Sequence, residues 1–269
     1  MNFKDKVKHK IKTQLRKFKN NQKQIDNLTK NFTNIDKLTR GIDFVHDITK
    51  SFPKYDIDTI FDVGANVGQS SKFYLIHFPN SQIYCFEPIK ETFSKLQQNL
   101  KENERVYCYQ IGLSSVKRNA KMALQGGGSE SYFILDDSNK LLEYNNEIPT
   151  ASVELVTLDE FCETNSIDDI SYLKIDTEGE DLKVLKGAKR MLAEQKIDFV
   201  EVEAGMNPSN DRHVPCEKLK GFLESYGYFL FGVYSQKSEQ PIKKLYLRRA
   251  NLLFISARMG NMKKSFLHL

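Results

Sequence analysis

An acid followed by closely spaced glycines is the first feature of this sequence that could do chemistry. The stretch IFDVGANVGQSS contains Asp62, Gly64, Asn66 and Gly68. Glycine at a strand-to-helix turn has no Cβ, so a ligand can approach the backbone closely. A dinucleotide fingerprint requires further glycines at positions 66 and 69, where this chain has Asn66 and Gln69. The turn therefore favours a cationic or donor-rich ligand over a pyrophosphate, with a purely structural tight turn as the alternative.

A second acid ends the next apolar run. The stretch IYCFEP places Glu87 where α/β sheets hold an acid that accepts hydrogen bonds from both ribose hydroxyls. Together with Asp62 and the glycine turn, Glu87 describes a site for a nucleoside with a charged, non-phosphate tail. S-adenosylmethionine fits that description.

The stretch YLKIDTEGED is the second group of chemically capable residues. It reads as a buried strand that ends in acids and then begins a helix. Lys174 inside such a strand requires an ionic partner, and we expect Glu201 or Glu203 of the stretch FVEVE to provide it. Asp176 and Glu178 follow the strand, where they either face the ligand or cap the helix.

Methyl transfer from a sulfonium needs in-line placement and a group that accepts the hydroxyl proton. The candidate catalytic residues are Asp176, Glu178, Glu203 and His213. His213 follows the stretch NPSNDR, and an exposed loop histidine is the alternative interpretation. Histidines at zinc-ligand spacing are absent, so we expect no metal; the alternative is a divalent ion held by the acids at 176, 178 and 203.

Short β-rich runs alternate with helical runs after Pro53, which is typical of a parallel sheet built from βαβ units. The expected strands are Thr59–Val63, Gln82–Phe86, Val106–Ile111, Ser171–Asp176 and Asp198–Glu203. The expected helices are Gly68–His77, Lys90–Glu102, Glu180–Glu194 and Cys216–Tyr226. An antiparallel insertion between Ile111 and Leu158 and a final hairpin from GYFLFGVY and NLLFISAR complete the expected sheet.

Positive charge is concentrated at the amino end. Residues 1–24 hold nine Lys or Arg against one Asp, so the other 245 residues carry a net charge of −3. The body therefore lacks the basicity of a nucleic-acid-binding protein. Apolar residues from Val7 to Val45 recur at helical spacing, which predicts an amphipathic arm that packs, mediates a homodimer or makes weak contact with an anionic membrane surface. Four scattered cysteines and the lack of a long apolar run favour a cytoplasmic protein. A cytoplasmic protein that associates peripherally with the membrane is the alternative.

Several long motifs make this sequence resemble the FkbM family of S-adenosylmethionine-dependent methyltransferases. The resemblance covers roughly Thr59–Phe231 and is carried by FDVGANVGQSS, FEPIKETFSKLQQNL, VTLDEF, YLKIDTEGEDLKVLKGA, DFVEVEA and YGYFLF. It implies methyl transfer, usually to an oxygen of a sugar, polyketide or other small molecule. A non-catalytic nucleoside-binding or scaffold protein on the same fold is the alternative.

The resemblance also implies a class I, Rossmann-like α/β fold. We expect a mostly parallel seven-stranded sheet with helices on both faces, a small antiparallel insertion and an N-terminal helical arm. The expected organisation is an arm at residues 1–50, a methyltransferase domain at 51–260 and a tail at 261–269. The predicted cofactor-binding residues are Asp62, Gly64, Ala65, Asn66, Gly68, Glu87, Pro88, Gly112 and Asp176.

Overall fold

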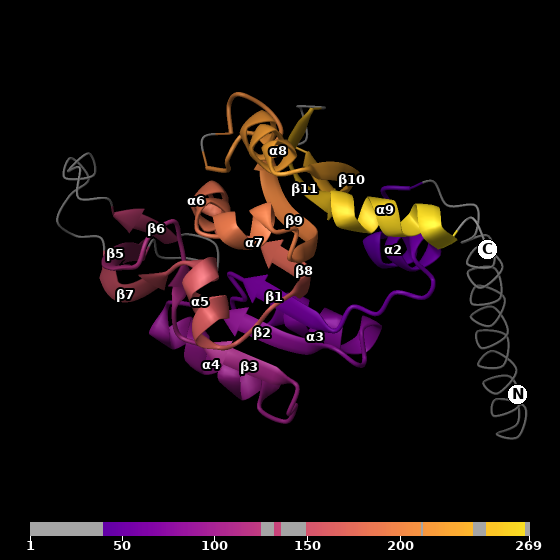
Figure 1. Ribbon diagram of the computed structural model, residues 1–269. Coiled ribbons are helices and arrows are strands. Elements are labelled where there is room, and N and C mark those ends of the chain that lie inside the picture. The colour runs from indigo at the N-terminus through magenta and orange to yellow at the C-terminus, as the bar shows by residue number, and fades with distance from the viewer. Residues whose placement is uncertain (1–39, 125–131, 136–148, 211, 239–245, 267–269) are drawn as a thin grey trace, which may run out of the picture. The chain divides into compact units, whose positions relative to one another are not determined.

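The computed structural model describes residues 40–124, 132–135, 149–210, 212–238 and 246–266. The chain divides into two units, Met1–Ile42 and Asp43–Leu269. Almost all of the predicted amphipathic arm lies outside the described residues, so its helical character stays a prediction. The elements below belong to the second unit (Figure 1).

A seven-stranded sheet forms the centre of this unit, in the order β10-β11-β9-β8-β1-β2-β3. Five neighbouring strands are parallel, whereas β11 runs antiparallel to both β9 and β10. The strands are β1 (Thr59–Val63), β2 (Gln82–Phe86), β3 (Val106–Tyr109), β8 (Ile170–Ile175), β9 (Ile197–Gly205), β10 (Tyr228–Ser238) and β11 (Leu247–Ser256). The predicted sheet is confirmed, and the final hairpin closes one edge with β11 on its inner side.

Helices cover both faces of this sheet, as predicted (Figure 1). They are α2 (Phe44–Ser51), α3 (Gln69–His77), α4 (Lys90–Leu100), α5 (Leu158–Thr164), α6 (Asp181–Lys186), α7 (Lys189–Ala193), α8 (Cys216–Ser225) and α9 (Ala257–Phe266). Strand alternation separates two apolar cores. Phe61 and Leu173 pack with the helices from α5 to α8, whereas Ile60 and Tyr172 pack with α2, α3, α4 and α9.

The single helix predicted over Glu180–Glu194 is wrong, because the chain breaks between α6 and α7. Gly187 lies at the break, and a Cβ there would meet the Ser114 carbonyl oxygen at 2.0 Å. The Gly187 carbonyl also accepts the backbone N–H of Asp159 at 3.0 Å. This close approach to two other segments interrupts the helix at a residue that only glycine can occupy without a shift of the backbone.

A smaller four-stranded sheet follows β3, in the order β4-β7-β5-β6. Its strands are β4 (Gly112–Leu113), β5 (Arg118–Leu124), β6 (Tyr132–Leu135) and β7 (Thr150–Val156). The pairs β5–β6 and β5–β7 are antiparallel, as predicted, and the short β4–β7 pair is parallel. The glycine run at 126–128 lies outside the described residues.

Both ends of the described part of this unit are anchored to its core. Asp43 caps α2 by accepting the backbone N–H groups of Val45 and His46 at 2.9 and 3.2 Å, and Ile48 is buried. At the other end, α9 continues past position 260, and its Arg258 pairs with Asp198 at 2.7 Å. No helix among the described residues is both long and apolar enough to span a membrane.

Candidate active site

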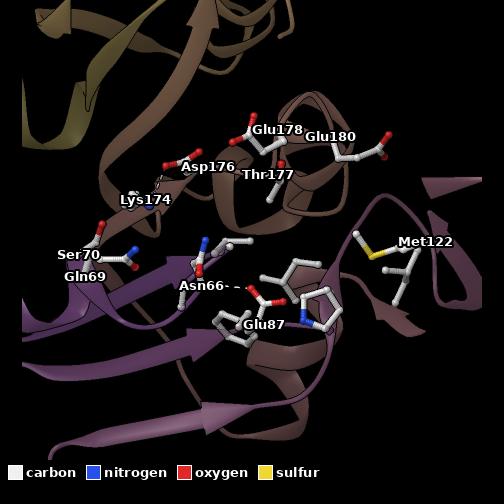
Figure 2. Close-up of a pocket in the computed structure, with 18 of the residues that line it drawn as sticks. Asn66, Gln69, Ser70, Glu87, Met122, Lys174, Asp176, Thr177, Glu178 and Glu180 are labelled. Carbon is white, nitrogen blue, oxygen red and sulfur yellow. Dashed lines mark hydrogen bonds and ion pairs between the residues drawn. The ribbon is translucent and has the colours of Figure 1, made fainter. Parts of the chain in front are cut away.

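A cavity of about 310 Å³ opens at the carboxyl ends of β1, β2 and β8 (Figure 2). This is the edge at which open parallel sheets bind ligands. Its walls come from the turns after those strands, from the smaller sheet and from β11. The lining residues include Gly64, Ala65, Asn66, Glu87, Pro88, Gly112, Met122, Leu155, Lys174, Asp176, Thr177, Glu178, Glu180 and Arg249.

The glycine turn after β1 is shaped by contact with the neighbouring strand. Gly64 has φ +80°, and a Cβ at this position would meet the carbonyl oxygen of Asp176 at 2.0 Å. The backbone N–H groups of Gly64 and Ala65 both donate to the Phe86 carbonyl at 3.0 Å. Because these amides are already used, the turn does not form a phosphate cradle. The prediction of a non-phosphate ligand agrees with this geometry.

Glu87 is held in the cavity wall by two backbone amides. Its carboxylate accepts the N–H of Asn66 at 3.2 Å and the N–H of Ile89 at 3.0 Å. The side chain is buried, and this burial raises the pKa of Glu87 to about 7 although both hydrogen bonds act in the opposite direction. The acid is therefore fixed in orientation, and hydroxyl donors can reach it only from the cavity.

An ion-pair chain runs from the cavity wall into the central sheet. Lys174 Nζ is 3.3 Å from both Asp62 Oδ1 and Asp176 Oδ2. The prediction that Glu201 or Glu203 pairs with Lys174 is wrong: Glu201 instead accepts hydrogen bonds from Tyr172 and Asn251. Burial lowers the pKa of Lys174, but the charges of Asp62 and Asp176 outweigh it, and the pKa lies above its usual value.

Asp62 is completely buried and accepts a hydrogen bond from Ser71 Oγ at 2.6 Å, in addition to its pair with Lys174. It therefore lies behind the cavity wall and connects β1 to α3. Gly68, at the start of α3, packs against Leu96 and Leu100. Both residues were predicted to bind the cofactor, and the structure places them in supporting positions that do not line the cavity.

Glu178 enters the cavity from a strained turn between β8 and α6. Its φ is +54° and that of Gly179 is +109°, a pair of left-handed conformations that costs free energy for the non-glycine residue. Asp181 fixes the turn by accepting the Gly179 N–H at 3.2 Å and the Thr177 hydroxyl at 3.1 Å. Arg212 Nε lies 2.7 Å from Glu178 Oε2. Figure 2 shows Glu178 beside Asp176 and Thr177 at the cavity rim.

Glu203 and His213 lie behind Glu178, outside the set of lining residues. Each of these two residues is 4% exposed, so the alternative of an exposed loop histidine is wrong. His213 Nε2 is 2.8 Å from Glu203 Oε2 and 3.5 Å from Glu178 Oε2. A bridge between Gly205 and Pro215 holds the loop against the end of β9 and buries the histidine there.

The structure thus brings Asp176 and Glu178, but not Glu203 or His213, to the cavity surface. Sequence reasoning missed three charged lining residues: Lys174 as a wall residue, Glu180 and Arg249. Glu180 reads as an ordinary first-turn acid of a helix. Arg249 comes from β11, which the chain threads between β9 and β10, and no local motif marks it.

Comparison with known proteins identifies the family of this chain. The pattern of the methyltransferase FkbM domain matches residues 62–230. The chain therefore belongs to the FkbM methyltransferase family, and it is an enzyme of the methyltransferase class.

Two similar proteins have descriptive names. The 2-O-methyltransferase NoeI of Sinorhizobium fredii is 25% identical over 62% of this chain and 71% of its own length. The hexuronic acid methyltransferase AglP of Haloferax volcanii is 25% identical over 57% of this chain and 59% of its own length. Among solved structures, precorrin-6y C5,15-methyltransferase of Geobacter metallireducens aligns with a TM-score of 0.40 and 14% identity, over 77% of this chain and 84% of that one.

Proposed function

We propose that this chain transfers a methyl group from S-adenosylmethionine to a hydroxyl group of a sugar, a glycan or another small molecule. The observation that supports it most directly is Glu87, a buried carboxylate with both oxygens oriented by backbone amides at the ligand edge of the sheet. Such a group recognises the two adjacent hydroxyls of a ribose. The family match over residues 62–230 supports the reaction class.

The cavity suits a nucleoside that carries a sulfonium. Apolar side chains from the smaller sheet, including Met122 and Leu155, offer a surface for an adenine ring. Figure 2 shows Met122 on the opposite side of the cavity from Lys174 and Ser70. Lining acids at positions 87, 176, 178 and 180 outnumber the lining cations Lys174 and Arg249, which favours a positively charged ligand. When bound, S-adenosylmethionine supplies an activated methyl group.

Asp176 is the best-placed proton acceptor of this chain. Its side chain is 34% exposed against 22% for Glu178, and both line the cavity. Lys174 keeps Asp176 in place through their 3.3 Å ion pair. A carboxylate in this position needs only to accept the hydroxyl proton as the methyl group is attacked, because alignment supplies much of the rate. The name of AglP supports a sugar derivative as the acceptor, and the name of NoeI supports transfer to an oxygen atom.

The test has two stages. Thermal unfolding is measured with S-adenosylmethionine, S-adenosylhomocysteine and NAD, and we expect the two sulfur nucleosides alone to stabilise the chain. Methyl transfer from a labelled donor to a panel of sugars and uronic acids is then measured for the wild type and for Asp176→Asn. Binding without transfer to any acceptor would favour the scaffold alternative, and stabilisation by NAD alone would overturn the proposal.

The basic segment at residues 1–24 supports a second, separate proposal, that it mediates self-association. Its apolar residues at helical spacing suit packing against a second copy of the chain. Its nine Lys or Arg residues suit the alternative, which is binding to an anionic membrane surface. Light scattering and co-sedimentation with anionic vesicles distinguish them. Hydrophobic self-association resists salt, whereas vesicle binding weakens steeply between low and physiological ionic strength.

A further inference from the structure

Three potential metal ligands converge behind the cavity from three different segments. Glu178 comes from the turn after β8, Glu203 from the end of β9 and His213 from the loop before α8. One ligand atom from each lies within 4.8 Å of the others. The shortest separation is the 2.8 Å between His213 Nε2 and Glu203 Oε2.

Asn210 determines which nitrogen of His213 carries the proton. The Asn210 side-chain amide donates from Nδ2 to the Arg248 carbonyl at 2.8 Å, and its Oδ1 accepts the backbone N–H groups of Arg212 and His213 at 3.3 and 3.2 Å. These bonds fix the amide with Oδ1 facing the imidazole. His213 Nδ1, 3.0 Å from that oxygen, must therefore be the donor. In the neutral ring, Nε2 carries a lone pair.

That lone pair faces the carboxylates without a hydrogen bond. Although His213 Nε2 and Glu203 Oε2 are close, neither atom has a hydrogen-bond partner among the described residues. Both side chains are more than nine-tenths buried, so water does not compensate them freely. Converging buried acceptors are costly unless a cation lies between them.

Each of the three residues also has an outer partner that orients it. Arg249 pairs with the other oxygen of Glu203, Arg212 pairs with Glu178 and Asn210 holds His213 Nδ1. Outer partners of this kind orient the ligands of protein metal sites, where a ligating histidine donates its second N–H to a fixed acceptor. The three candidate ligands and their outer partners together have the composition of a protein metal site.

We propose that Glu178, Glu203 and His213 bind one divalent transition-metal ion. One imidazole and two carboxylates suit Mn²⁺ or Zn²⁺. Mg²⁺ and Ca²⁺ are disfavoured, because they prefer all-oxygen sites and because the two arginines offset the charge of both carboxylates. The expectation of a metal-free protein rested on the absence of histidines at zinc-ligand spacing, and a site assembled from three separate segments does not require that spacing.

Since Glu178 also lines the cavity, a bound ion would hold one wall of the acceptor site in place. The inference rests on the geometry of the three ligands and not on the identity of the methyl acceptor. Ion binding can therefore be measured without any assay of methyl transfer, and the two proposals can fail separately.

The experiment uses the full chain after removal of metal with a chelator. Mn²⁺ binding is followed by electron paramagnetic resonance and calorimetry, and we expect one ion per chain. Glu203→Gln and His213→Gln should each weaken binding at least tenfold, and Asn210→Ala about 10- to 100-fold through loss of the outer partner. His77→Gln, at an exposed histidine in α3, is the matched control and should bind as the wild type does.

Thermal unfolding shows whether each variant is folded and supplies an independent readout. Mn²⁺ should raise the melting temperature of the wild type and of His77→Gln but not that of Glu203→Gln. Nitrogen-15 spectra of the imidazole provide the opposing test. A chelated protein in which both His213 nitrogens stay protonated at pH 8, with spectra unchanged by Mn²⁺, would show that a proton occupies the site and would overturn the proposal.

Discussion

The backbone N–H of Asn66 donates to the carboxylate of Glu87 at 3.2 Å, which joins the turns after β1 and β2. Both residues line the cavity, one from the glycine turn and one from the end of the neighbouring strand. The same carboxylate also receives the N–H of Ile89. The turn that lines the cavity and the acid that we propose binds the ribose are therefore one hydrogen-bonded unit, so a shift of one residue displaces the other.

This unit predicts that cofactor affinity depends on pH. Burial raises the pKa of Glu87 to about 7, so the free protein keeps this acid protonated below that pH. Ribose hydroxyls donate most strongly to the ionised carboxylate. The cofactor therefore binds with full affinity well above pH 7, and its affinity falls as the pH drops below 7. From the proton linkage we expect the dissociation constant of S-adenosylhomocysteine to rise about tenfold between pH 8 and pH 6. Calorimetry across that range measures it.

Glu87→Gln separates this effect from other titrating groups. Burial also raises the pKa of Asp181 to about 7, but Asp181 does not line the cavity. The variant should bind S-adenosylhomocysteine about 1–3 kcal/mol more weakly at pH 8, with an affinity that no longer changes between pH 6 and pH 8. A pH dependence that survives the substitution would assign it to another residue.

The sequence predicts the sheet well because its strands carry a strong local signal. The apolar runs of β1 and β2 are buried between two layers of helices, and their predicted bounds are those observed. Asp62 shows the limit of such reasoning. An acid at the end of a strand predicts a ligand site. Only the structure shows that the side chain of Asp62 is held behind the cavity wall by its contacts with Lys174 and Ser71.

Contacts between segments far apart in the sequence explain the remaining differences between the predictions and the structure. Arg249 reaches the cavity because β11 pairs with β9 in a register that places it opposite Gly205. His213 is buried because its loop folds back onto the end of β9. Neither pairing leaves a periodic pattern near the residue concerned, so sequence spacing alone could not place them.

Gly64→Ala should destabilise the protein more than an ordinary glycine substitution does. The new Cβ would lie 2.0 Å from the backbone oxygen of Asp176, and the residue has φ +80°. We expect a loss of roughly 2 kcal/mol or more in the free energy of unfolding, measured by urea denaturation. Gly221→Ala is the control: its Cβ meets nothing within 4 Å in the middle of α8, so it should stabilise by about 0.5–1 kcal/mol. Equal effects would show that the close approach at Gly64 is absent in solution.

Lys174→Met should be strongly destabilising because it leaves the fully buried Asp62 without its cation. We expect a loss of roughly 3–5 kcal/mol in the free energy of unfolding at neutral pH. The double variant with Asp62→Asn should recover much of this loss, since the uncompensated charge is removed. Lys220→Met breaks the exposed pair with Glu224 and should change stability by less than about 1 kcal/mol. A Lys174 variant as stable as the Lys220 variant would contradict the buried pair.

Removal of the amino end should be harmless up to α2 and damaging beyond it. Ile48 in α2 and Phe52 just after it are buried. Phe44 stacks on Tyr172 with ring centroids 5.6 Å apart, and Asp47 accepts a hydrogen bond from the Tyr234 hydroxyl at 2.8 Å. A variant that lacks residues 1–39 keeps all these contacts and should unfold at the same urea concentration as the full chain. A variant that lacks residues 1–52 loses them, and loss of the two buried side chains alone should cost about 3–6 kcal/mol. Equal midpoints for the two variants would show that α2 does not contribute to the core, and a loss already in the shorter deletion would extend the stabilising segment into residues 1–39.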